Sequence, residues 1–446
     1  MAKSSTNSIV VVKPLPSLRS ISVEGFKSIN EELTIDLGKL TVLAGVNSSG
    51  KSSIIQPLLL LKQTLEAPFD PGPLRLNGPN VKFTKVEQLL CANRRKEELG
   101  RFAFGMTVEN IGNCKLYFTS NNGSPVTIHR MNLIHNGKFY EYTEYEGAVM
   151  PANLNSSIIK DFESVFSKTP SKVQVSVTRD RCFLYPAIRF QDWSQQTNPI
   201  PFGGRTEPFK FLLMHLIHIP GLRGNPERTY PVSAVGIHFP GTFENYTASI
   251  IALENSNKTD FLARLSQNLR HLGLASQVDA RLIDDTQVEL RVGRLPNSSE
   301  RDMVNIADVG FGVSQTLPVV VALLSAKPNQ IVYIEQPEIH LHPRAQHAMA
   351  KLLVDAANRG VQVIIETHSS ILLLGIQSLV AENAIDPEIV KLHWFRRDKT
   401  GDTQITSAEL DAAGRFGDWP EDFDDVSLQA QRRYLDAAEK QLENER

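Results

Sequence analysis

The chain has 446 residues, of which 41% are hydrophobic and 22% charged, and its formal net charge at pH 7 is −2. This length accommodates two or three domains, or one domain with a large insertion. The composition excludes a disordered or fibrous chain, and the near-neutral charge gives no bulk support for a protein that coats nucleic acid. The three cysteines, Cys91, Cys114 and Cys182, share no metal-like spacing and predict buried or incidental thiols in a reducing cytoplasm.

The N-terminal segment and the apolar runs argue against targeting to a membrane. MAKSSTNSIVVVKPLP holds an apolar run of only four residues before Lys13, which is too short for the core of a signal peptide. The other apolar runs fall well short of the roughly 20 residues that span a bilayer. We therefore expect a cytoplasmic protein without a membrane partner.

Short strand-like segments open the chain within residues 18–45, at LRSISVEGF, ELTIDL and LTVLAG. The last ends at Gly45, as expected of a buried strand that feeds a tight turn. Residues 54–65 predict a buried helix with Pro57 in its first turn or two. From about residue 100 to 190, short strands and turns predict an antiparallel meander. Helices are expected over 208–219 and 259–273.

The pattern becomes regular again toward the C-terminus. QIVYIE (330–335) and VQVIIET (361–367) are β-rich apolar runs typical of the middle of a parallel sheet. Between them, Pro343, a series of apolar residues at helical spacing and then Gly360 predict one helix with its start and stop. Strand, helix and strand in this order predict a parallel α/β core with a right-handed crossover.

GVNSSGKSS (45–53) matches the pattern G-x-x-x-x-G-K-S between a predicted strand and a predicted helix. Gly45 and Gly50 let the backbone curl so that successive N–H groups face an anion. Lys51 supplies charge for the β- and γ-phosphates, the Ser52 hydroxyl is placed for Mg²⁺, and the helix dipole adds to both. We predict a nucleotide-phosphate cradle formed by Asn47, Ser48, Gly50, Lys51, Ser52 and Ser53.

A P-loop of this kind is completed by an acid at the end of a neighbouring strand, which holds Mg²⁺ directly or through water. Glu335 ends IVYIE and is predicted to share the metal with Ser52. His368 follows VIIET, where its side chain would reach the γ-phosphate. Gly312 and Ser314 open a further apolar helix, and this start is either a second anion-binding device or an ordinary serine cap.

In order and spacing these motifs resemble the ATP-binding-cassette (ABC) ATPases of the SMC/RecF-like branch. The matching segments are GVNSSGKSS (Walker A), GFGVSQ (a degenerate signature), IVYIEQPE (Walker B) and ETHSS, which carries the switch histidine. The segments IEQPEIHLHPRAQ, IPGLRGNPERTY and GRFGDWPEDFDD resemble stand-alone bacterial AAA-family ATPases with a C-terminal domain of unknown function, related to ATPases of anti-phage defence systems. The resemblance covers most of the chain and is weakest over about 115–205.

The resemblance implies an α/β fold: an ABC-ATPase head of the P-loop NTPase type, with an antiparallel β subdomain and an inserted α/β region. It divides the chain into an N-terminal part of the head with Walker A (1–125) and an inserted β/helical lobe (126–300). A C-terminal part of the head (301–400) would hold the signature, Walker B and switch histidine, and a tail (401–446) would follow.

In that family, two heads sandwich two ATP molecules, and each signature serine contacts the γ-phosphate bound by the partner's Walker A. The resemblance therefore implies ATP and Mg²⁺ as cofactors, a homodimer or higher homo-oligomer that forms through ATP-sandwiched heads, and a role in trans for Ser314. By the same analogy Lys27 approaches the phosphates and Phe26 the base, although an apolar strand residue beside a surface lysine is the commoner explanation.

The residue after the Walker B acid is usually a glutamate that acts as general base, but here it is Gln336. Gln336 either orients the water and gives slow turnover, or Glu338 supplies the carboxylate, or the site clamps ATP with little hydrolysis. We expect an ATPase that hydrolyses slowly with Glu338 assisting. His340 and His342 suggest a metal site but lack evident further ligands, which favours a structural or dimer-contact role.

The expected function is an ATP-driven switch or sensor that controls an effector, a nuclease or toxin on another chain, in prokaryotic anti-phage defence. The alternative is an SMC/RecF-like DNA-repair or DNA-binding ATPase, which leaves nucleic acid open as a partner. Its basic candidates are NRRKEELGR (93–101), Arg228 and Arg223, of which Arg223 could instead face the nucleotide or the partner head. A transporter head is disfavoured because LSGGQ is missing, and a Toprim nuclease because the acids of WPEDFDDV lack its strand framework.

Overall fold

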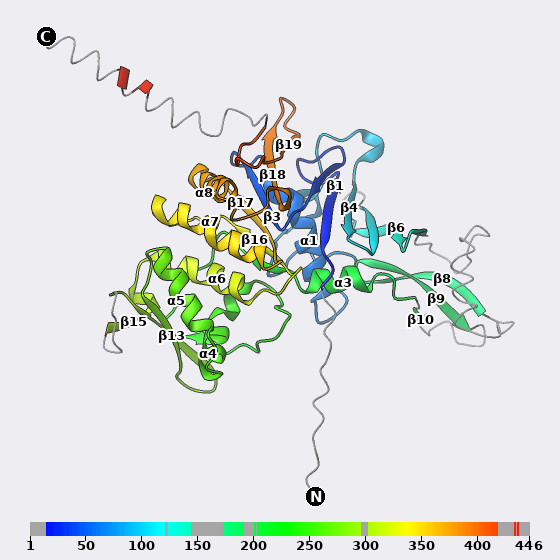
Figure 1. The fold of residues 1–446 in the computed structure, drawn as a ribbon. Helices are drawn as coiled ribbons and strands as arrows, with labels where there is room; N and C mark the ends of the chain where they lie inside the picture. The colour runs from blue at the N-terminus through cyan, green and yellow to red at the C-terminus, as the bar shows by residue number, and fades with distance from the viewer. Residues whose placement is uncertain are drawn as a thin grey trace, which may run out of the picture.

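The computed structural model describes residues 15–120, 124–143, 173–190, 200–201, 203–295, 302–417, 432–433 and 435–436. These residues form an α/β fold in which a central sheet is flanked by helices and a second, antiparallel sheet stands to one side (Figure 1).

The central sheet has six strands in the order β11–β16–β17–β3–β18–β19. The strands are β11 (Ile217–Ile219), β16 (Ile331–Glu335), β17 (Gln362–Thr367), β3 (Leu40–Gly45), β18 (Val390–Arg397) and β19 (Thr403–Ala408). Neighbouring strands are parallel except β18 and β19, which are antiparallel. Burial of β16, β17 and β3 on both faces explains their continuous apolar sequences. The predicted parallel core is confirmed.

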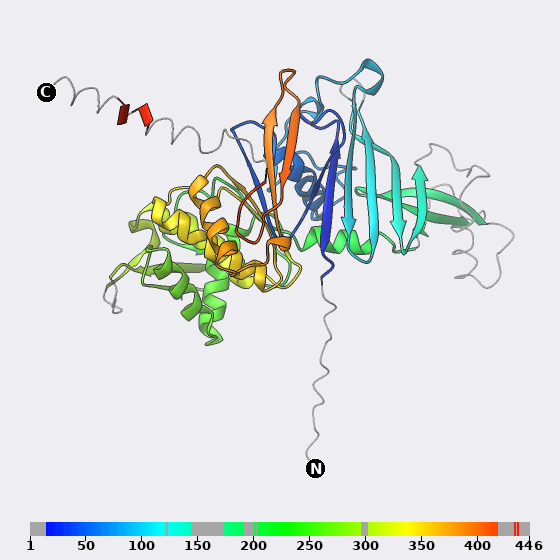
Figure 2. The same cartoon turned by 45° about the horizontal axis from the view of Figure 1, so that its top comes forward.

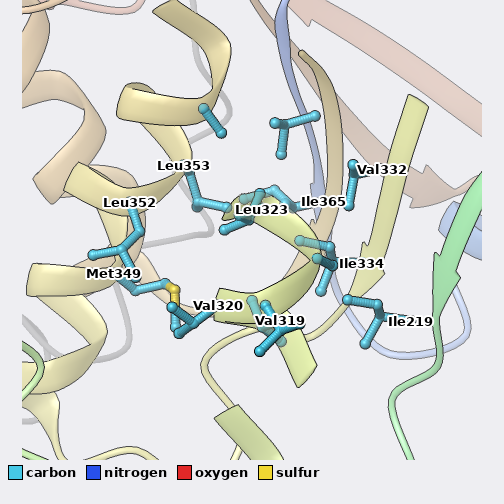
Figure 3. Close-up of a cluster of buried hydrophobic side chains, with 14 of the residues drawn as sticks. Ile219, Val319, Val320, Leu323, Val332, Ile334, Met349, Leu352, Leu353 and Ile365 are labelled. Atoms are coloured by element: carbon cyan, nitrogen blue, oxygen red, sulfur yellow. The ribbon is translucent and has the colours of Figure 1, made fainter. Parts of the chain in front are cut away.

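Helices cover both faces of this sheet. One face carries α6 (Phe311–Ser325), α7 (Pro343–Asn358) and α8 (Ser370–Ala381), and the other carries α1 (Lys51–Leu65). Figure 3 shows side chains of β16 and β17 meeting side chains of α6 and α7, namely Val332, Ile334 and Ile365 against Val319, Val320, Leu323, Met349, Leu352 and Leu353. Because strand side chains alternate, Ile331 and Tyr333 belong to the opposite core, on the side of α1.

The second sheet has six antiparallel strands in the order β2–β1–β4–β5–β6–β7 and stands beside the helical part of the molecule (Figure 2). The strands are β2 (Leu33–Asp36), β1 (Leu18–Glu24), β4 (Arg101–Val108), β5 (Gly112–Thr119), β6 (Thr127–His135) and β7 (Lys138–Thr143). They confirm the predicted meander. The domain boundary expected between residues 125 and 126 falls between β5 and β6, which pair along their length in this sheet. A boundary there would divide one sheet between two parts of the chain, and it remains a proposal.

The region between the two parts of the head contains a three-stranded arm and a helical lobe. The arm consists of β8 (Val173–Asp180), β9 (Phe183–Phe190) and β10 (Ile200–Pro201). The helices are α3 (Glu207–Met214), α4 (Thr247–Ser256) and α5 (Phe261–His271). A small sheet completes the lobe with β12 (Tyr230–Pro231), β13 (Gln277–Leu282), β14 (Gln287–Gly293) and β15 (Met303–Asn305). Short 3₁₀ helices are η1 (Val86–Gln88), η2 (Lys96–Glu98), η3 (Phe243–Tyr246), η5 (Ile306–Asp308) and η6 (Pro387–Ile389).

Two predicted segments need comment. The helix expected over 208–219 is wrong in its last part, because α3 ends at Met214 and residues 217–219 form β11. Two β-branched residues flank His218, and pairing of this segment with β16 at the edge of the central sheet decides its conformation. At the other end, residues 403–408 of the expected tail form β19 of the central sheet. The acids Asp422, Asp424 and Asp425 lie outside the described residues.

All three cysteines are buried and free, as predicted. Among the described helices, none is long and apolar enough to cross a membrane.

Candidate functional site

The turn between β3 and α1 is a tight backbone cradle. Gly45 and Gly50 have φ angles of 143° and 103°, in the region that favours glycine. A Cβ atom at Gly45 would lie 2.2 Å from the carbonyl oxygen of Phe395, and one at Gly50 would lie 2.2 Å from Thr403 Oγ1. Side chains are therefore excluded at both positions, and the turn closes against β18 and β19.

Lys51, the first residue of α1, turns its ammonium back into this cradle. Its Nζ donates hydrogen bonds to the carbonyl oxygens of Gly45 at 2.9 Å and Val46 at 2.8 Å. Burial lowers the pKa of Lys51, and the nearby carboxylates of Glu366 and Glu338 oppose that shift. The cradle thus presents a fixed positive charge together with the start of a helix, an arrangement suited to anions.

A cavity of about 430 Å³ lies over the cradle. It brings together most of the predicted site residues, namely Asn47, Ser48, Gly50, Lys51, Ser52, Ser53, Glu335, Gln336 and His368. Residues that the sequence did not single out complete the lining, namely Ser28, Ser49, Gln56, Glu366 and Arg397. Lys27, expected near the phosphates by analogy, also lines it.

Glu335 ends β16 and is held from two sides. His218 Nε2 lies 3.2 Å from one carboxylate oxygen, and the Gly221 amide donates to the other at 3.1 Å. Burial alone would raise the pKa of Glu335, but these contacts and the charge of Arg223 lower it below its usual range. The carboxylate is therefore ionised and fixed in orientation at neutral pH.

Glu366, on β17, is the most informative residue that sequence reasoning missed. It accepts hydrogen bonds from Ser52 Oγ at 2.8 Å and from the Tyr333 hydroxyl. Burial, together with the neighbouring Glu335 carboxylate, raises the pKa of Glu366 to about 7, against the hydrogen bonds from Tyr333 and Ser52. Sequence reasoning selected Glu335 as the acid at the end of its strand, but β17, which carries Glu366, lies between β16 and the P-loop strand β3.

Gln336 and His368 reach the cavity from the ends of neighbouring strands. Gln336 has φ 47°, a left-handed conformation that is uncommon outside glycine. Its main-chain N–H donates a hydrogen bond to the main-chain carbonyl of Glu366 at 2.8 Å. Burial and the charge of Lys51 lower the pKa of His368, so its ring is neutral at pH 7.

Glu338 does not line the cavity. One of its carboxylate oxygens accepts from Thr367 Oγ1 at 2.7 Å and from the His368 amide at 3.0 Å. Its side chain is buried, and burial raises its pKa. Glu338 therefore lies behind His368 and holds the main chain from which the histidine projects.

Ser314 and Gly312 are also outside the P-loop cavity. Ser314 lines a second cavity of about 620 Å³ beside α6 and donates to the Phe311 carbonyl at 3.1 Å. The N-cap of α6 is Gly310, which provides no side-chain cap, and Ser314 lies within the helix with its hydroxyl on the Phe311 carbonyl, so Ser314 does not cap α6. The ordinary serine-cap explanation is therefore wrong.

Three of the basic candidates, Arg223, Arg228 and Arg94, make contacts within the chain. Arg223 is buried, and its Nη atoms donate to the carbonyls of Gln315 at 3.1 Å and Glu335 at 2.8 Å. Arg223 does not line the P-loop cavity; together with Ser314 it lines the second cavity, beside α6. Arg228 pairs with Asp308 at 2.8 Å, and Arg94 bridges two glutamates, Glu24 at 3.0 Å and Glu98 at 3.4 Å.

Two further expectations are resolved by packing. Phe26 is fully buried, with its ring centroid 5.4 Å from that of Phe104, so the expected contact with a base is wrong. His342 caps α7 by accepting from the Arg344 amide at 3.3 Å, and the His340 ring lies 5.8 Å from that of Phe311. Both histidines thus have contacts within the chain.

The residues present fit a nucleotide with a divalent cation. A cradle without Cβ atoms and a lysine ammonium suit phosphate, and the Ser52 hydroxyl beside two carboxylates suits a hard cation. Among the described residues, no group of three His, Cys, Asp or Glu side chains is arranged for a metal. A cation here would therefore take further ligands from phosphate and water.

One family model matches most of the chain. The family described as "AAA domain, putative AbiEii toxin, Type IV TA system" matches residues 40–374. The Old nuclease of Escherichia phage P2 is 43% identical over 49 residues, which are 11% of this chain and only 8% of the nuclease.

The solved structures most similar to the chain include SMC heads. A head bound to the C-terminal winged-helix domain of ScpA gives a TM-score of 0.48 at 13% identity, over 89% of this chain and 99% of that one. A Pyrococcus furiosus head with an extended coiled coil, bound to the C-terminal domain of ScpA, gives 0.46 at 12% identity, over 89% and 97%.

Proposed function

This chain belongs to the AAA family described as "AAA domain, putative AbiEii toxin, Type IV TA system", and on that premise we propose that it is a slowly hydrolysing ATPase that acts as a molecular switch. In this proposal it binds ATP and Mg²⁺ in the P-loop cavity and pairs with a second copy through the bound nucleotide. The paired state controls a partner effector, a nuclease or toxin encoded on another chain.

The observation that carries the proposal is the convergence of three segments on one cavity. The β3–α1 turn supplies Lys51 and Ser52, β16 supplies Glu335, and the end of β17 supplies His368. Lys51 would neutralise phosphate charge, and the neutral His368 ring would contact the γ-phosphate. Bound Mg²⁺, held by Ser52 and Glu335, would shield the phosphate oxygens from one another.

Slow turnover is supported by the chemistry of Gln336. Its amide can orient a water molecule by hydrogen bonding but cannot take up the proton that the water must lose. Glu338 assists by holding the His368 main chain, through the 3.0 Å bond to that amide, and does not itself line the cavity. Hydrolysis without a well-placed base would leave ATP bound for long periods.

Pairing of two copies is supported by the placement of Ser314. The start of α6 has no side-chain cap at Gly310, yet it lies at a different cavity from the P-loop of its own chain. Exposed apolar side chains occur at the P-loop, beside β16 and at the start of α6, namely Val46 (56% exposed), Leu222 (87%) and Phe311 (51%). A second copy would bring Ser314 to the partner's nucleotide and cover such side chains.

The setting is proposed from the family. Its description names a putative toxin of a type IV toxin–antitoxin system, which supports defence or toxin control as the context. Direct DNA binding remains the alternative: Arg94 and Arg228 are in ion pairs and Arg223 is buried, whereas Arg95, Lys96 and Arg101 are exposed.

Equilibrium binding of a fluorescent ATP analogue tests the proposal at its base. Wild-type protein should bind the analogue, and Lys51→Ala should lose that binding because the cradle loses its ammonium. Lys85→Ala, which removes an exposed lysine outside the cavity, is the matched control and should bind like wild type. Retained affinity in Lys51→Ala would contradict the assignment of the site.

A further inference from the structure

Glu366 and Glu335 are side by side at the C-terminal ends of two neighbouring strands of the central sheet, β17 and β16. Their strands are parallel neighbours, and the two residues are in register. Side chains in register on adjacent strands share a face, with the strands about 4.8 Å apart. That face is the one toward α1, because Tyr333 and Ile364, two residues earlier on each strand, pack in the same core as α1. Two carboxylates therefore meet where the P-loop helix begins.

Glu366 has no cationic partner in the described part of the chain. Its oxygens accept from the neutral hydroxyls of Ser52 and Tyr333. The two ammonium groups that line the same cavity have other partners: Lys51 donates to the carbonyls of Gly45 and Val46, and Lys27 donates to Gln56 Oε1. Buried carboxylates in proteins are normally paired with a cation or bound to a metal. Two adjacent acids with hydroxyl partners thus make a site that a divalent cation would complete.

Side chains that hydrogen-bond to the two carboxylates hold each of them in one orientation. Tyr333 holds Glu366, and His218 holds Glu335 at 3.2 Å. The two rings stack on each other with centroids 5.4 Å apart and planes 15° apart. The second ring nitrogen of His218 lies 3.1 Å from Asn80 Oδ1. Such outer hydrogen bonds are typical around metal ligands, whose orientation they set.

We propose that Glu366 is a second carboxylate of the divalent-cation site, which it forms with Glu335 and the Ser52 hydroxyl. The inference rests on the proposed function, because the cation would accompany a nucleotide in the P-loop cavity. The inference goes beyond the proposed function in two residues: Glu366 would bind the cation directly, and Tyr333 would orient Glu366 through its hydroxyl.

The test measures cation affinity separately from nucleotide affinity. Mn²⁺ is titrated into protein saturated with a non-hydrolysable ATP analogue, and free Mn²⁺ is followed by electron paramagnetic resonance. Glu366→Gln should weaken Mn²⁺ binding by about 10- to 100-fold while metal-free nucleotide affinity does not fall, because the substitution removes a negative charge from the cavity. Glu109→Gln, at a surface glutamate paired with Arg19, is the matched control and should change neither quantity.

Each outcome decides the proposal. Wild-type Mn²⁺ affinity in folded Glu366→Gln would overturn it and leave Glu366 as a structural acceptor. If Glu366→Gln does not fold, Tyr333→Phe replaces it: this variant keeps the carboxylate but frees its orientation, so its Mn²⁺ affinity should fall by a smaller factor. Unchanged affinity there would overturn the proposal too. A wild-type protein that binds no nucleotide would instead overturn the proposed function.

Discussion

Arg223 and Gln315 tie the start of helix α6 to the loop after β11. Arg223 Nη1 donates to the Gln315 carbonyl at 3.1 Å, and Gln315 Nε2 donates back to the Gly224 carbonyl at 2.7 Å. The other end of the same guanidinium donates to the carbonyls of Glu335 at 2.8 Å and Gln336 at 3.2 Å. One buried side chain therefore links the end of β16, in the P-loop cavity, to the helix that carries Ser314.

We expect Arg223→Lys to separate nucleotide binding from pairing. Burial lowers the pKa of Arg223 to about 10, but its guanidinium stays charged at pH 7. Its two Nη atoms donate to carbonyls of two different segments, and a lysine, whose donors all lie on one nitrogen, cannot reproduce this fork. Unsatisfied buried carbonyls should lower the free energy of unfolding by about 1–3 kcal/mol, measured by urea denaturation. Affinity for ATP should persist, while ATP-dependent pairing weakens.

Arg228→Lys is the control for that prediction. Arg228 is exposed and paired with Asp308 at the surface, so its replacement should change stability by less than about 1 kcal/mol. Equal losses of pairing in the two variants, or none in Arg223→Lys, would show that the Arg223 link does not position α6.

Gln336→Glu should accelerate hydrolysis. The substitution places a carboxylate, which can accept a proton from water, where the cavity now has an amide. A positioned general base contributes about 10²–10⁴-fold, so steady-state phosphate release should rise at least about tenfold even with imperfect geometry. The same substitution made together with Lys51→Ala should show no gain. An unchanged rate in the single variant would mean that proton transfer is not limiting.

Glu338 can be tested by two substitutions with different chemistry. Glu338→Gln keeps an oxygen that accepts from Thr367 Oγ1 and the His368 amide, whereas Glu338→Ala removes it. If Glu338 positions His368, hydrolysis should survive in the glutamine variant and fall in the alanine variant. A collapse of hydrolysis in both, with ATP affinity intact, would instead identify Glu338 as the general base.

The free energy of unfolding should decrease as pH rises, because the pKa of Glu366 is higher in the native state than in the unfolded chain. Burial and Glu335 raise its pKa from an ordinary 4.5 to about 7, so between these values the unfolded chain has released a proton that the native state retains. The native state then binds more protons, and the free energy of unfolding falls as pH rises, by about 3 kcal/mol in total, until the carboxyl ionises near its native pKa. Groups facing Glu366, namely Ser52, Tyr333, Glu335 and Lys51, set this value.

Urea unfolding of wild type and Glu366→Gln at about pH 5 and about pH 8, without nucleotide or metal, measures the effect. Wild type should lose more stability than the variant between the two conditions. The difference between the proteins isolates Glu366, since other buried acids such as Glu338 are present in both. Parallel pH profiles would show that the pKa of Glu366 is not raised.

Local sequence determined the parts of the fold and site that could be predicted. The P-loop is contiguous, so a strand, two glycines and a lysine specify its shape without knowledge of the rest of the fold. Glu335 and His368 follow from the rule that parallel strands end at one edge of a sheet. Glu366 was missed because its approach to Ser52 depends on β17 lying between β16 and β3, an order that no local pattern encodes.

Other misses share that cause. Residues 217–219 follow a helix in sequence but form a strand, because they pair with β16 in the central sheet. Arg223 looked like a surface cation in a Gly/Pro-rich loop, yet its partners are 92 and 112 residues away along the chain. In each case a tertiary contact outweighs the local preference.

Ser314→Arg provides the most direct test of the central claim, that two copies pair through bound ATP. The molar mass of wild type and variant should be measured by sedimentation equilibrium with and without Mg²⁺ and a non-hydrolysable ATP analogue. Ser378→Arg is the control, because Ser378 likewise lies on a helix and donates to a preceding backbone carbonyl. The account predicts that wild type and Ser378→Arg become dimers only with nucleotide, while Ser314→Arg binds nucleotide and stays monomeric. A wild-type mass that does not change with nucleotide, or a Ser314→Arg variant that pairs like wild type, would contradict it.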